Sequence, residues 1–151
     1  MAYRGLETGS REVVTHVIRQ GRILFAFSSA LNPGGAALLG DDISRHLAVH
    51  GDGVKDVAFG VADARKIFAS AVARGAAVVQ EPTELTDAHG TVVIATVKTY
   101  GDTLHTFVER GAYAGPFLPG YKAVVDTDPL ARVTAPVGLD FIDHVGGTPG
   151  G

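Results

Sequence analysis

The chain of 151 residues contains no cysteine and no run of lysine or arginine. The missing cysteine excludes a disulfide framework, a thiolate nucleophile and a cysteine-ligated zinc site. The net charge is -3, and the chain lacks the cluster of basic residues that binding to nucleic acid or to an anionic membrane requires. No apolar stretch approaches the roughly 20 residues that a membrane span needs, and the first residues do not resemble a signal peptide. We therefore expect a cytoplasmic protein with no nucleic-acid or membrane partner.

Glycine is abundant, but it does not form a repeat. The 20 glycines gather at the ends of apolar segments, which excludes collagen-like and solenoid folds. The 46% of hydrophobic residues can bury a core, either as one domain or as two small modules.

Apolar periodicity predicts strands and two helices between these glycines. Residues 3–12 and 111–138 show no such pattern, and the second range is expected to be an interdomain linker. The expected elements are a hairpin of residues 13–18 and 23–27, a helix from Asp41 or Asp42 to about Val49, a strand over 54–61, a helix after Asp63 that Gly75 ends, a short element over 76–79, a turn at Glu81 and Pro82, and strands over 92–97 and 104–108.

The segment Leu139–Val145 carries the main candidate site residue. Its alternation predicts a short strand from which His144 projects, and a neutral imidazole can bind iron or zinc. A non-haem iron site of the facial-triad type needs two histidines and one carboxylate. The residues that follow His144 contain neither, so we expect the chain to end where a catalytic domain would begin.

Other histidines and one glycine cluster are weaker candidates. His16 is interpreted as a polar strand residue. His46 and His50 have the spacing of a helical metal pair, but a solvent-exposed or capping role is the favoured interpretation. Residues 51–53 are rejected as a phosphate loop, because a strand rather than a helix N-terminus is expected to follow them.

Several segments together resemble the 4-hydroxyphenylpyruvate dioxygenases of the vicinal oxygen chelate superfamily. The similarity runs in order from about Ala2 to Val145. The segments that carry it are Tyr3–Glu12, His50–Asp56, Thr99–Thr103, Phe117–Tyr121 and Ile142–His144.

The resemblance implies an α+β fold of βαβββ modules with a mixed sheet that forms a half-barrel. It places an incomplete first module at 1–50, a second module at 51–110, the linker at 111–138 and the first strand of a truncated catalytic domain at 139–151. Only His144 falls on a catalytic position, the first Fe(II) ligand. A weak vestigial metal pair is a further hypothesis, because Asp56 and His105 fall on positions that face one cup in metal-binding members.

The implied activity is the Fe(II)-dependent conversion of 4-hydroxyphenylpyruvate and dioxygen to homogentisate in tyrosine and phenylalanine catabolism. The chain is expected to be the N-terminal domain of a homo-oligomer and to be inactive alone. Two alternatives stay open, namely a hydroxymandelate synthase-like dioxygenase and a non-catalytic dimerising module.

Overall fold

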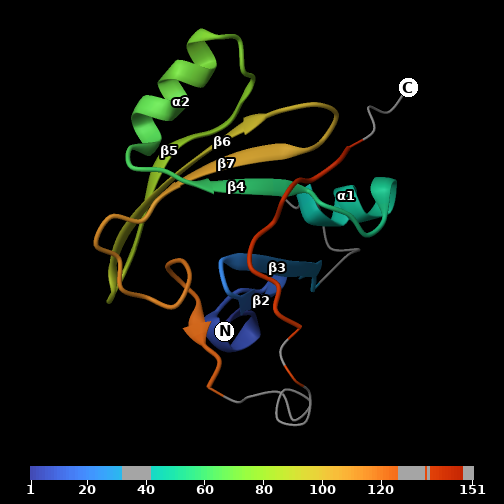
Figure 1. Ribbon diagram of the computed structural model, residues 1–151, viewed down its shortest axis with the longest axis vertical. Coiled ribbons are helices and arrows are strands. Elements are labelled where there is room, and N and C mark those ends of the chain that lie inside the picture. The colour runs from blue at the N-terminus through green and yellow to red at the C-terminus, as the bar shows by residue number, and fades with distance from the viewer. Residues whose placement is uncertain (32–41, 126–134, 136, 148–151) are drawn as a thin grey trace. The chain divides into compact units, whose positions relative to one another are not determined.

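The computed structural model describes residues 1–31, 42–125, 135 and 137–147. These residues form two compact units, and Figure 1 labels both α-helices and strands β2 to β7. Unit 1 contains residues 1–45 and 120–147, and the described part of unit 2 is residues 46–119. Helix α1 (Asp42–His50) begins in unit 1 and ends in unit 2, and it confirms the helix predicted there. The predicted start at Asp41 lies outside the described residues, and the predicted domain boundaries stay predictions.

Unit 1 is built on an antiparallel sheet in the order β3-β2-β1-β8. The predicted hairpin is confirmed as β2 (Val13–Gln20) and β3 (Ile23–Ala30), whose ladder pairs Gln20 with Ile23. Gly21 supplies the positive φ of 56° that the tight turn needs.

The sequence patterns did not predict two short strands of this sheet, the inner strand β1 and the edge strand β8. β1 (Ala2–Arg4) lies in a stretch predicted to lack regular structure, which also contains the 3-10 helix η1 (Leu6–Thr8). β8 (Lys122–Ala123) lies in the predicted linker and pairs with β1. Strands of two or three residues are too short for alternation to be visible, and they form here because a distant strand completes their hydrogen bonds.

Unit 2 follows the predicted strand–helix–strand–strand–strand order. Its sheet order is β4-β7-β6-β5, in which β4 and β7 are parallel and the other pairs are antiparallel. The predicted mixed sheet is therefore confirmed. The elements are β4 (Asp56–Gly60), α2 (Ala64–Ala73), β5 (Val78–Asp87), β6 (Gly90–Lys98) and β7 (Leu104–Glu109).

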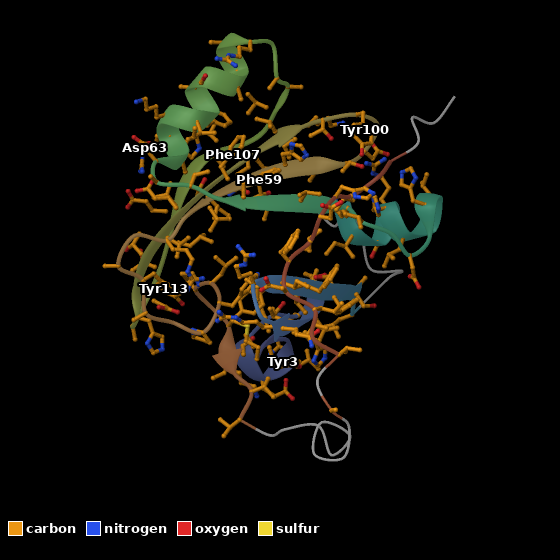
Figure 2. The ribbon with its side chains drawn as sticks, in the orientation of Figure 1. Tyr3, Phe59, Asp63, Tyr100, Phe107 and Tyr113 are labelled. Atoms are coloured by element: carbon orange, nitrogen blue, oxygen red, sulfur yellow. The ribbon has the colours of Figure 1, made fainter. Side chains whose placement is uncertain are left out.

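Helix α2 begins and ends as the sequence predicts, and it packs on β5, β6 and β7 (Figure 1). The Asp63 side chain accepts a 2.8 Å hydrogen bond from the Lys66 N–H, which caps the first turn (Figure 2). Gly75 follows the helix with a φ of 98°. No helix in the described ranges is long and apolar enough to cross a membrane.

The predicted turn at Glu81 and Pro82 is wrong. Both residues lie inside β5, which runs unbroken from Val78 to Asp87. The pairing of β5 with β6 shifts register between Gln80 and Thr83, so Pro82 sits in an irregularity of the ladder. β5 is also the edge strand of its sheet, where a residue that lacks an N–H donor is tolerated.

The Tyr113 side chain, in the loop after β7, packs against the β5–β6 turn of unit 2 (Figure 2). It is only 7% exposed, and its hydroxyl donates a 2.9 Å hydrogen bond to Asp87. The Arg110 guanidinium lies 5.1 Å from the ring centroid, and the Ala114 N–H donates to the His89 carbonyl. The loop after β7 is thereby attached to the β5–β6 turn, at the end of the sheet where β7 itself ends.

Burial, together with the hydrogen bond to Asp87, raises the pKa of Tyr113 from 10.0 to about 12. The unfolded chain then loses this proton at a lower pH than the folded chain, so the stabilising contribution is complete below pH 10 and is lost as the pH rises to 12. We expect the free energy of unfolding, measured by urea titration, to fall more steeply over this range in the unmodified protein than in Tyr113→Phe. Parallel curves for the two proteins would contradict this expectation.

Candidate functional site

The His144 segment is not the strand that its alternation predicts. Residues 137–147 have no regular secondary structure, and the side chains of Asp143 and His144 are each 82% exposed. A strand needs a neighbour with which to exchange hydrogen bonds, and the described residues supply only one backbone bond to this segment. The predicted strand at 139–145 is therefore corrected to an extended, irregular segment.

One ring nitrogen of His144 lies beside a carboxylate. Its Nδ1 lies 2.8 Å from a carboxylate oxygen of Asp143. A proton held on Nδ1 by that carboxylate leaves Nε2 with its lone pair, which is the arrangement that metal-binding histidines use. Both groups are so exposed that the contact itself adds little stability.

The β2–β3 turn holds this segment in place within unit 1. The Arg22 N–H donates a 3.1 Å hydrogen bond to the Asp140 carbonyl. The Arg22 guanidinium lies 3.3 Å from the Asp140 carboxylate and 5.5 Å from the centre of the Phe141 ring. Sequence reasoning missed this role of Arg22, because the two partners are 118 residues apart and no local pattern connects them.

Glycine at position 21 allows this close approach. A Cβ atom on Gly21 would lie 3.2 Å from the carbonyl oxygens of Leu139 and Asp140, which is tighter than ordinary contact. Its positive φ would also strain any larger residue. The same glycine therefore makes the hairpin turn and accommodates the segment that carries His144.

Three metal ligands do not come together in the described parts of the chain. No group of three histidine, cysteine, aspartate or glutamate side chains there could hold a metal ion. His144 fits Fe(II) as one ligand, because its Nε2 is accessible and its Nδ1 has a carboxylate partner. The position of His144 as the first iron ligand stays a prediction.

The predicted metal pair on α1 is in contact with a carboxylate. The rings of His46 and His50 have centroids 4.7 Å apart, as their spacing of four implies. His50 Nε2 lies 3.0 Å from a carboxylate oxygen of Asp102 in the β6–β7 turn. His50 thus ties the end of α1 to the β6–β7 turn, whereas His46 is only 8% exposed, so the predicted solvent-exposed role is wrong for His46.

The hypothesis of a vestigial pair of Asp56 and His105 is wrong. The parallel register aligns Asp56 with Leu104 and Val57 with His105, so Asp56 and His105 lie on opposite faces of the sheet. Asp56 accepts a 2.6 Å hydrogen bond from the Thr106 hydroxyl. His105 meets the ring edge of Phe59, at a centroid distance of 5.1 Å. The error arose because the sequence fixes alternation within a strand but not the register between strands.

The structure agrees with the predictions for His16 and for residues 51–53. His16 is an exposed residue of β2, and its ring lies 5.0 Å from that of Tyr3. Residues 51–53 are followed by a strand, β4, so no helix N-terminus is present there to hold a phosphate.

Comparison with known proteins gives consistent results. No family model matches the chain. The chain is 51% identical over 148 residues to the 4-hydroxyphenylpyruvate dioxygenase of Yarrowia lipolytica, covering 95% of this chain and 36% of that protein. It is 53% identical to the enzyme of the same name from Danio rerio, covering 97% and 36% respectively. The chain therefore spans about a third of the length of the curated relatives it matches.

A solved structure supports the fold. A mutant 4-hydroxymandelate synthase from Streptomyces coelicolor is similar with a TM-score of 0.68 and 31% identity, over 82% of this chain and 34% of that chain. Together with the mixed sheet of unit 2, this similarity confirms the predicted fold class. The sequence resemblance to 4-hydroxyphenylpyruvate dioxygenases is confirmed as well.

Proposed function

We propose that this chain is the N-terminal part of an Fe(II)-dependent 4-hydroxyphenylpyruvate dioxygenase of the cytoplasm, which acts in tyrosine and phenylalanine catabolism. The observation that carries the proposal is about 50% identity to enzymes of that name over 95% or more of the chain. The substrates would be an aromatic 2-oxo acid and dioxygen, and the product homogentisate. The complete protein would be a homo-oligomer.

The role of this chain in that enzyme would be to present one ligand and to support it. Bound iron would polarise the 2-oxo acid and activate dioxygen. His144 would bind the metal through Nε2, while the Asp143 carboxylate keeps the proton on Nδ1. Arg22 would hold the preceding residues on the β2–β3 turn. The other two ligands of an iron triad would come from outside the described residues.

A 4-hydroxymandelate synthase-like activity is the alternative, and the similarity to that synthase favours it as a second candidate. The two activities would share iron and substrate but differ in whether the ring or the side chain is hydroxylated. The identity to the curated relatives is higher, at 51% against 31%, which supports the ring hydroxylase.

The test begins with sequencing the transcript on both sides of this reading frame. If it encodes a longer protein, we expect that protein to consume oxygen with 4-hydroxyphenylpyruvate only when Fe(II) is present. Chromatography of the product separates homogentisate from hydroxymandelate and decides between the candidates. The chain alone is expected to show no turnover, because a single imidazole holds Fe(II) too weakly. A longer protein that is inactive with loaded iron would contradict the proposal.

A further inference from the structure

Unit 1 contains a cavity that shares no lining residue with the His144 segment. Its volume is about 580 Å³, within the range of small-molecule sites. Two of the segments that carry the family resemblance, Tyr3–Glu12 and Phe117–Tyr121, contribute to its wall, and the proposed activity assigns them no role. The residues relevant to binding are Arg4 of β1, Arg11 and Glu12 before β2, Thr15 of β2, Ser28 of β3, Ile43 of α1 and Tyr121.

The charge of this cavity favours an anion. Arg4 and Arg11 both line it, and neither forms an ion pair with a residue that the structure describes. The carboxylate of Glu12 offsets one of the two charges, so the lining keeps one net positive charge. A guanidinium presents its N–H donors as a fork, which matches the two oxygens of a carboxylate.

The wall of the cavity also offers a hydroxyl donor to a ligand. Thr15 Oγ1 and Ser28 Oγ face each other across β2 and β3 at 2.9 Å. Two hydroxyls carry two donor protons, and the bond between them uses one. Thr15 is only 3% exposed, whereas Ser28 is an exposed residue of β3, so the second proton can point from Ser28 toward solvent or toward a bound molecule. An oxygen of a ligand that reached Ser28 would accept this proton.

The remaining lining distinguishes an organic acid from an inorganic ion. Ile43 contributes an apolar side chain, and the Tyr121 ring lies 6.0 Å from the Arg4 guanidinium. We propose that this cavity binds a small organic carboxylate, whose oxygens meet Arg4, Arg11 and the Thr15–Ser28 hydroxyl pair while its carbon skeleton lies against Ile43 and Tyr121. The inference stands on unit 1 alone and does not depend on the proposed dioxygenase activity.

The test is titration of the isotopically labelled chain with benzoate, followed by amide chemical shifts. We expect saturable shifts at residues around the cavity, and about tenfold weaker binding in Arg4→Gln and in Arg11→Gln. Arg11→Lys, which keeps the charge but not the fork, should fall between Arg11→Gln and the unmodified protein. Arg74→Gln, at an exposed arginine of unit 2, is the matched control and should bind benzoate normally.

Two further probes decide the class of ligand. Benzamide has nearly the shape of benzoate without its charge, and we expect it not to bind. Inorganic phosphate tests whether any oxyanion suffices, and equally tight binding of phosphate would overturn the assignment to an organic carboxylate. Shifts that do not saturate, or binding unchanged in both arginine-to-glutamine variants, would overturn the site. Circular dichroism of each variant establishes that unit 1 is still folded.

Discussion

Tyr113→Ala is expected to lower the free energy of unfolding of unit 2 by about 3–5 kcal/mol, as other buried aromatic residues do when truncated. The ring is almost completely buried, and its loss would leave a cavity under the Arg110 guanidinium. The substitution would also remove the hydroxyl that donates to Asp87. Because the loop after β7 is held at the end of the sheet by this ring, both losses act on one region.

Urea unfolding followed by circular dichroism measures this change. Tyr100→Ala is the matched control, since Tyr100 is 46% exposed in the β6–β7 turn and its truncation should cost less than about 0.5 kcal/mol. Tyr113→Phe keeps the ring and isolates the hydrogen bond, so it should cost about 1–2 kcal/mol. A Tyr113→Ala protein as stable as Tyr100→Ala would mean that the loop contributes nothing to unit 2.

His144→Ala is expected to have the largest effect on activity in the longer protein. If His144 is one of three iron ligands, its loss should reduce iron content and iron-dependent oxygen consumption at least about 100-fold, because even changes around a ligand cost 10- to 100-fold. The effect follows from the chemistry of the imidazole and not from stability, since the side chain is 82% exposed and buries nothing.

Iron content per protein and oxygen consumption are measured together for this variant. His16→Ala is the control, because His16 is another exposed histidine of unit 1 and lies on β2. It should bind iron as the unmodified protein does. Retention of full iron content and turnover in His144→Ala would remove His144 from the proposed site while leaving the family resemblance untouched.

Local patterns in the sequence were sufficient for β4, α2, β6 and β7 of unit 2 and for the β2–β3 hairpin, but not for the length of β5. The cap at Asp63 and the positive φ of Gly21 and Gly75 are properties of single residues and their neighbours, so they can be predicted from sequence. Pro82 misled the prediction because proline breaks most ladders, and only the position of β5 at the sheet edge makes it acceptable.

The site depends more on tertiary structure than the elements do. The sequence proposed His144 as a candidate ligand and revealed the family resemblance, and the missing cysteine excluded thiolate chemistry. It could not reveal that Arg22 holds the His144 segment, that the register places Asp56 and His105 on opposite faces, or that Arg4 and Arg11 share a cavity. Each of these facts depends on contacts between residues far apart in the chain. Periodicity reports only which face of its own element a residue occupies, whereas register and packing decide which other residues share that face.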